Sequence, residues 1–380
     1  MKRVLVVVAV AVISLFIFWM PFLFRIESFW GVEFGKHGME TIVQNFDGLN
    51  YLAVAKTLYD PALLERNFAG FGNPPIYYAA HFPLYPLLIR AMGMFANGPQ
   101  ALLLSIVISN ILLAGGLYFF FVSLSKNKKL ASTLTIIALF FPARMLLVRG
   151  VGTSEPLFMF FVLTSLAMAY RGKHWGASIL GSLAVLTRSP GILLFGAYLI
   201  QFTIYNLHPT RIYEGASQFT KKLKLFYPYL LMPITLVVLF GWYGYQYGDF
   251  WAYFRGSSEL HPVFFPPFLI FSNTARWIDG MWREEIIYLY LFYGVGIYLV
   301  KDKLMKVFGL VTGALLLLTA HRDLARYALP LAPIAILGFA PYLNKKNMKW
   351  LLLLIVPIFL LGWQFVVANV QPVSDWSSLL

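Results

Sequence analysis

The chain of 380 residues is 59% hydrophobic and 18% aromatic but only 12% charged, and its mean hydropathy is +0.71. Soluble domains carry about 25% charged residues, so this composition excludes a soluble globular protein and indicates a polytopic membrane protein. The sequence has no cysteine, which excludes disulfide bonds, thiolate metal ligands and a cysteine nucleophile. A net charge of +14 would suggest nucleic acid binding in a soluble protein, but here we attribute it to loops sorted across a membrane.

The first apolar segment, Val4 to Phe24, is about twenty residues long, which is enough to cross a bilayer. It follows Met1-Lys2-Arg3, as the apolar core of a secretory signal would. However, it exceeds the usual core of about 7–15 residues, and no small-residue cleavage site follows it. We therefore expect a retained anchor with a cytoplasmic N-terminus.

Lysines predict the topology, because cytoplasmic loops carry an excess of positive charge. Lysine runs separate the apolar segments: Lys126, Lys128 and Lys129; Lys173; Lys221, Lys222 and Lys224; Lys301, Lys303 and Lys306; and Lys345, Lys346 and Lys349. Placing these runs inside gives about eleven spans, of which the two in 174–206 are short for a crossing. The expected spans are 4–24, 99–124, 130–148, 153–170, 174–187, 189–206, 226–246, 284–300, 305–320, 326–343 and 349–369. The predicted fold class is thus an all-α integral membrane protein, a polytopic helical bundle.

Two longer segments lie outside under this topology. Residues 25–98 form the first extracytoplasmic loop, where Leu49 to Tyr59 has an amphipathic pattern and Phe82 to Phe95 is too short to be a span. We expect both to be interfacial helices. Residues 247–283 form the second outer loop, and residues 1–380 make up a single transmembrane domain.

Arginine is distributed in the opposite way to lysine. The arginines placed on or near the outer side are Arg25, Arg66, Arg90, Arg144, Arg149, Arg188, Arg255, Arg276, Arg283, Arg322 and Arg326. Guanidinium is planar and permanently charged, and its forked donors match phosphate oxygens bidentately. An arginine-rich outer face therefore suggests a phosphate-handling site, with snorkelling and pairing to outer acids as the alternative for any single arginine.

The main chemical candidate in the first outer loop is Asp47, within Phe46-Asp47-Gly48-Leu49-Asn50-Tyr51. An ionisable residue held beside a bilayer and flanked by aromatic side chains is a functional-site candidate. Its carboxylate can act as a base toward a hydroxyl, with Gly48 allowing close backbone approach and Asn50 and Tyr51 orienting the substrate. The alternative is that Asp47 only caps the helix that follows.

Four further segments fall on the same side as Asp47: His81 to Arg90, Gly152 to Phe158, Leu186 to Gly191 and His321 to Pro330. Glu155 begins a span where the helix dipole favours an acid, and Arg188 lies in a tight turn where backbone amides can also meet an anion. Arg322 and Arg326 are four residues apart and share a helix face if that helix begins early. His81 and His321 could assist protonation or phosphate binding, or serve as structural hydrogen-bonders.

Taken in chain order, Phe46–Tyr59, Phe82–Ile89, Ser154–Phe158, Leu186–Gly191 and Arg326–Pro330 resemble the PIG-V-like mannosyltransferases of the GT-C superfamily of membrane glycosyltransferases. The departures are Phe46, where the family pattern has Trp, and His81, where it has an aromatic residue. The resemblance implies a lipid-phosphate sugar donor, an extracytoplasmic active site and inversion at the anomeric carbon.

The residue roles follow from the motifs and from this resemblance. Asp47 is the expected catalytic base, and Arg326, Arg322 and Arg188 are expected to bind the donor phosphate. Substrate-binding residues are expected to be Asn50, Tyr51, His81, Glu155 and His321. No cofactor is expected, and a divalent metal is not favoured, since no outer stretch has the close carboxylate pair that usually holds Mg²⁺ or Mn²⁺. A metal held by Asp47, Glu155 and Asp323, should they converge in space, is the alternative.

The predicted function is transfer of a hexose, mannose by preference, from a polyprenyl-phosphate donor to a glycolipid, glycan or protein acceptor outside the membrane. Besides membrane lipids no other partner is expected, and nucleic acid is not one. We place the protein in a prokaryotic plasma membrane. The alternatives are transfer of another sugar, such as an aminoarabinose-like one, to a lipid, a lipid-linked saccharide transporter or flippase, and a non-catalytic subunit of a glycosylation complex. A transporter would place its charges along a path near the bilayer midplane.

Overall fold

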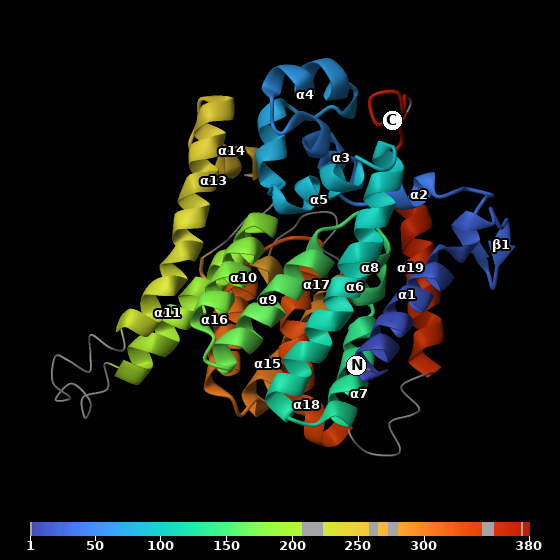
Figure 1. Ribbon diagram of the computed structural model, residues 1–380. Helices are drawn as coiled ribbons and strands as arrows, with labels where there is room; N and C mark the ends of the chain where they lie inside the picture. Colours follow the sequence, from blue (N-terminus) through green and yellow to red (C-terminus); the bar gives the residue numbers. More distant parts are fainter. Residues whose placement is uncertain (1, 207–222, 258–264, 273–279, 344–352, 374) are drawn as a thin grey trace.

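The computed structural model describes residues 2–206, 223–257, 265–272, 280–343, 353–373 and 375–380 (Figure 1). Some features predicted above lie outside these ranges: Lys221, Lys222, Lys345, Lys346, Lys349, Arg276, the start of the expected span 349–369 and parts of the second outer loop.

Every expected span corresponds to one helix or to helices in series. Their bounds are α1 (Lys2–Leu23), α6 (Gly98–Ser125), α7 (Lys128–Phe140), α8 (Arg144–Gly150), α9 (Glu155–Tyr170), α10 (His174–Thr187), η3 (Ser189–Gly191), α11 (Ile192–Asn206), η5 (Tyr227–Leu230), α13 (Leu231–Tyr247), α15 (Gly280–Leu299), α16 (Lys303–Leu318), α17 (Leu324–Tyr327), η7 (Leu329–Leu331), α18 (Ala332–Leu343) and α19 (Ile355–Ala368).

Within the described ranges, four helical segments are long and apolar enough to cross a membrane: Lys2–Leu23, Gly98–Ser125, Leu223–Tyr247 and Leu324–Leu343. Shorter apolar helices such as α9 and α19 occupy further expected positions, and α9 is buried along most of its length. The protein is therefore a multi-pass helical membrane protein, as its composition indicated.

The expected span 130–148 is wrong as a single helix. It is divided into α7 and α8, whose axes are inclined by 78°. Phe141 is extended and Pro142 follows it, so the helix ends where proline removes a backbone donor and restricts the preceding residue. The bend turns α8 into the bundle, and this places both of its arginines inside the protein or at its rim.

Arg149 stabilises this bend and is not part of an outer face. Its side chain is fully buried and donates to the carbonyl oxygens of Leu139 and Ala11 at 2.9 and 3.1 Å. It also donates to Oδ1 of Asn110 at 3.1 Å and Oγ of Ser14 at 2.6 Å. The guanidinium thus joins the end of α7 to α1 and α6, which gives it a structural role instead of the phosphate-handling one expected for outer arginines.

The first outer loop folds into short elements, of which α3, α4 and α5 gather at one end of the bundle (Figure 1, top), whereas the β hairpin lies at the side of the bundle beside α19. They are a hairpin of β1 (Ser28–Phe29) and β2 (Val32–Glu33), then α2 (Glu40–Val43), α3 (Gly48–Thr57), α4 (Pro61–Phe68), η1 (Ala69–Phe71), η2 (Pro75–Ala80) and α5 (Leu84–Met92). The two helices expected in this loop are thus present as α3 and α5. From the second outer loop come α14 (Ala252–Ser257), which packs against η2, and η6 (Leu269–Ser272).

Replacing Arg149 tests its structural role. Arg149→Leu leaves several buried acceptors without their donor, and each unsatisfied group costs about 1–3 kcal/mol. We expect the melting temperature of the purified protein in detergent to fall by about 5 °C or more. Arg66→Leu, at an exposed position on α4, should change it by less than about 2 °C. Equal shifts for the two variants would contradict the structural role.

Candidate active site

The carboxylate of Asp47 belongs to a cluster of charged groups instead of capping a helix. Asp47 occupies the N-cap position of α3, yet its side chain makes no capping hydrogen bond. Nη2 of Arg326 lies 2.7 Å from Oδ2, and Nε2 of His81 lies 3.7 Å from Oδ1. The Asp47 side chain is 28% exposed, against 6% for Arg326, so the carboxylate faces outward and the guanidinium lies beneath it.

The guanidinium of Arg326 bridges two carboxylates that are far apart in sequence. Its Nη2 binds Asp47, and its Nε donates to Oε1 of Glu155. That same Glu155 oxygen accepts a second ion pair from Nη1 of Arg188 at 2.7 Å. The four side chains form one chain of ion pairs, Asp47–Arg326–Glu155–Arg188, in which two positive and two negative charges balance.

Close backbone packing brings these residues together. A Cβ atom on Gly152 would lie 2.7 Å from the Cα of Gly48, so two glycines allow the start of α3 to meet the turn before α9. The hydroxyl of Tyr51 lies 2.7 Å from Oγ of Ser154, which also accepts from Arg188 at 3.2 Å. These hydrogen bonds fix α3 against the beginning of α9, where the dipole favours the Glu155 carboxylate.

Asp47 is ionised and paired at neutral pH. Partial burial alone would raise the pKa of its carboxyl group. The Arg326 charge and the His81 contact outweigh that effect and hold the pKa well below its usual range. Nearby, burial and the charge of Asp47 raise the pKa of Tyr77 to about 12, so this phenol remains protonated and available as a donor.

His81 and Asn50 lie beside Asp47 as expected. The ring of His81 stacks edgewise on Tyr51 at 5.3 Å, and its backbone carbonyl accepts from the Tyr59 hydroxyl at 2.7 Å. Asn50 is buried on α3, and its side chain reaches Tyr77. The structure therefore groups Asp47 with its expected substrate-binding neighbours on one wall of the site.

The expected shared helix face of Arg322 and Arg326 is wrong. Helix α17 begins only at Leu324, so Arg322 precedes it and is exposed, whereas Arg326 is buried. The carbonyl of Arg322 accepts from Nε1 of Trp282 at 3.2 Å. His321 lies at the same edge, where burial lowers the pKa of its imidazole and the nearby Asp323 charge opposes that effect. Its Nδ1 accepts from the Asp323 amide at 3.0 Å.

Sequence reasoning missed the groups that support Arg326. The Cζ atom of Arg326 lies 4.9 Å from the ring centroid of Phe46, and that ring stacks on Phe365 of α19 at 5.5 Å. The sequence singles out Phe46 only as a neighbour of Asp47 and as a departure from the family pattern, and nothing in its spacing connects it with Phe365. Asp323 pairs with Arg144 at 3.4 Å, at the start of α8.

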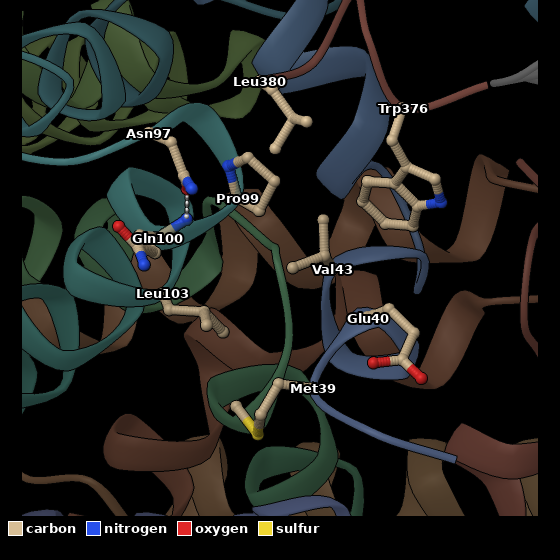
Figure 2. A pocket seen from close by; sticks show the side chains of 9 residues that line it. All are labelled: Met39, Glu40, Val43, Asn97, Pro99, Gln100, Leu103, Trp376 and Leu380. Carbon is tan, nitrogen blue, oxygen red and sulfur yellow. Dashed lines mark hydrogen bonds between the residues drawn. The ribbon is translucent and has the colours of Figure 1, made fainter.

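Among the described residues, no group of three or more His, Cys, Asp or Glu side chains is arranged to hold a metal ion. Away from the cluster, a largely apolar groove lies between α2, the start of α6 and the C-terminal residues Trp376 and Leu380 (Figure 2). None of the residues that line this groove belongs to the chain of ion pairs.

The comparisons with known proteins identify the fold. No protein-family model matches the chain, and no curated protein is significantly similar to it in sequence. The chain is similar to ArnT from Cupriavidus metallidurans, solved bound to undecaprenyl phosphate, with a TM-score of 0.54 and 15% identity over 93% of this chain and 62% of that one. It is also similar to the archaeal oligosaccharyltransferase AglB from Archaeoglobus fulgidus, solved with an inhibitory peptide and a dolichol-phosphate, with a TM-score of 0.50 and 12% identity over 98% of this chain and 57% of that one.

Both of these proteins are GT-C glycosyltransferases, so the fold is the GT-C membrane fold, and the predicted fold class is confirmed. The chain spans about three fifths of the length of each of these structures. Membership of the PIG-V-like family stays a prediction.

Arg326→Lys tests the bridge between the carboxylates. A single ammonium group lacks the fork that binds Asp47 and Glu155 together, so one of the carboxylates loses its partner. Breaking a buried pair costs about 3–5 kcal/mol, so we expect a clear fall in melting temperature. Arg25→Lys is the matched control, because Arg25 pairs with Glu40 at 3.9 Å on the surface, where such a pair contributes about 1 kcal/mol or less. A melting temperature that falls no further for Arg326→Lys than for this control would contradict the bridge.

Proposed function

We propose that the protein is an inverting glycosyltransferase that moves a hexose, mannose by preference, from a polyprenyl-phosphate donor to an acceptor hydroxyl outside the membrane. The observation that carries the proposal is the partly exposed carboxylate of Asp47, which is paired with the buried Arg326 and lies in one cluster with the partly buried Arg188. A base at the surface with guanidinium groups beside it combines the two functions that transfer from a sugar phosphate needs.

In the proposed reaction, Asp47 takes the proton of the acceptor hydroxyl as that oxygen attacks the anomeric carbon. The bond between this carbon and the phosphate oxygen breaks, and its electron pair leaves with the phosphate, so the configuration inverts. The pairing with Arg326 makes Asp47 a weak base before the donor binds. When the donor phosphate attracts part of the guanidinium charge, the pKa of Asp47 rises, and its basicity increases at the moment it is needed.

We propose that the donor phosphate binds Arg322, which precedes α17, and Arg326, which lies on it. Arg322 is exposed there, and Arg326 has further N–H donors beyond those given to Asp47 and Glu155. Arg188, bound to Glu155 and Ser154, would hold the second carboxylate in place while Arg326 shifts toward the phosphate. His321 and Tyr77 would add polar contacts to phosphate or sugar oxygens.

The lipid part of the donor is supported by the structural neighbours, which were solved with undecaprenyl phosphate and with a dolichol-phosphate. A glycolipid, glycan or protein is proposed as the acceptor. The charged cluster also bears on the transporter alternative. Its members lie in loops and at helix ends instead of lining a path through the middle of the bundle, which favours transfer over transport.

Asp47→Asn tests the proposed base. The amide keeps the shape of the side chain but removes its basicity, so turnover should fall by about 100-fold or more while donor binding persists. The measurement is release of polyprenyl phosphate from polyprenyl-phosphate mannose by the protein in lipid vesicles. Mass spectrometry of glycolipids from cells with and without the gene supplies the acceptor.

The control is Asp60→Asn in the same loop. Asp60 caps α4, and asparagine caps equally well, so turnover should be unchanged. Near-normal turnover of Asp47→Asn would rule out Asp47 as the base.

The proposed topology can be tested in this cysteine-free chain. Met94→Cys and Trp251→Cys replace exposed side chains in the two outer loops, and Trp175→Cys replaces one next to the inner Lys173. A membrane-impermeant thiol reagent should label the first two in intact cells and the third only after permeabilisation. Labelling in the opposite order would place the site inside.

A further inference from the structure

We infer that residues 365–371, at the end of α19 and just beyond it, position the loop 44–47 that carries Asp47. Through Phe46, this C-terminal segment also fixes the guanidinium of Arg326. The effect on catalysis rests on the proposed function, whereas the contacts themselves do not.

Hydrogen bonds from the C-terminal segment hold the backbone on the N-terminal side of Asp47. The amide of Gln371 donates to the carbonyl of Gln44 at 3.0 Å, and its side-chain Nε2 donates to the carbonyl of Phe46 at 2.8 Å. Between them, Nδ2 of Asn45 donates to the carbonyl of Val366 at 2.9 Å. Asn45 also forms an antiparallel bridge with Val370 and accepts a hydrogen bond from Asn369. Each residue from Gln44 to Phe46 is therefore bound by this segment.

Phe46 needs external support because its backbone is strained. Its φ of 51° lies in the left-handed region, which costs a residue with a Cβ atom about 1–2 kcal/mol. Such conformations persist where the surroundings determine them and are found at functional sites. The hydrogen bond from Gln371 to the Phe46 carbonyl is one such constraint, and it directs the next residue, Asp47, toward Arg326.

An aromatic pair carries the same support to the charged cluster. The rings of Phe46 and Phe365 stack at 5.5 Å with an interplanar angle of 10°. Arg326 lies over the Phe46 ring at 4.9 Å, and Arg144 lies over the Phe365 ring at 4.6 Å. Cation–π contacts of this kind contribute about 0.5–2 kcal/mol, depending on their desolvation. The stacked ring of Phe46 therefore gives the buried Arg326 guanidinium a cation–π contact, in addition to its two ion pairs.

If Phe365 loses its ring, Phe46 can turn and Arg326 loses part of this surface. The ion pair with Asp47 should then weaken, and the carboxylate should accept a proton more readily. The charged and titratable groups that interact with Asp47 from the surrounding elements are Arg326, His81, Glu155, Tyr51, Tyr77, His321 and Tyr327. Only Arg326 among them is stacked on Phe46, so a change transmitted by Phe365 should reach Asp47 through Arg326.

The experiment compares Phe365→Leu with Phe365→Tyr and with Phe359→Leu. Phe359 is a buried phenylalanine on the same helix, and its ring contacts Phe18, Phe140 and Trp363 instead of the loop. We expect Phe365→Leu to lower kcat about tenfold and to move the acid limb of the kcat/KM profile upward by about one pH unit, because the base protonates at higher pH. Phe365→Tyr keeps the ring and should restore both values. Phe359→Leu should lower the melting temperature without moving the limb.

Hydrogen exchange gives a readout that does not depend on activity. In Phe365→Leu, but not in Phe359→Leu, the amides of residues 40–48 should exchange at least several-fold faster than in the natural protein. Gln371→Ala provides a second variant if Phe365→Leu does not fold. It removes one side-chain hydrogen bond at an exposed position. The control is Gln364→Ala, which replaces another exposed glutamine on α19.

Unchanged exchange in residues 40–48 together with an unmoved acid limb would overturn the positioning role. If Phe365→Leu exchanges faster in residues 40–48 but the natural protein transfers no sugar, the positioning contact is supported and the proposed function is overturned. The failure of one can therefore be distinguished from the failure of the other.

Discussion

The site depends on one interaction, the sharing of the Arg326 guanidinium between Asp47 and Glu155. A charge buried in a membrane protein must be paired or hydrogen-bonded, since the alternative is a large desolvation penalty. Arg326 meets this need with acids from two distant parts of the chain, and Glu155 in turn pairs with Arg188. The loop after α1, the start of α9, the turn before α11 and the short helix α17 are therefore held in one place by electrostatics, and the apolar helices around them only have to pack.

The same interaction determines what kind of base Asp47 can be. A carboxylate without such a partner would have a pKa near its usual value of about 4. The pairing with Arg326 keeps its pKa low, and the Asp47 side chain remains partly exposed. A ligand that competes for the guanidinium therefore increases the basicity of its neighbour. In the proposed mechanism, this arrangement couples phosphate recognition to proton transfer through the Arg326 side chain.

Sequence patterns predicted the fold class and the set of residues that meet at the cluster, because apolar length, lysine distribution and acid or arginine at span ends are local signals. Asp47, Glu155, Arg188 and Arg326 were all identified in this way. What could not be predicted depends on contacts between distant residues. From sequence, Arg149 is one more outer arginine, because the break at Pro142 that turns it into the bundle is not evident there. From sequence, Arg322 is a partner of Arg326 on one helix face, but the helix starts only at Leu324. No pattern in either segment predicts that Phe46 stacks on Phe365.

The dependence of the loop 44–47 on residues 365–371 has a consequence for biosynthesis. A chain made from its N-terminus exposes Asp47 early, whereas the segment that supports Phe46 is translated only after α18. During most of synthesis the carboxylate is present but its loop has no partner to hold it in the strained conformation. The loop 44–47 can therefore be held in this conformation only after α19 has been made, so that partly made chains in the membrane carry Asp47 on a loop without its support.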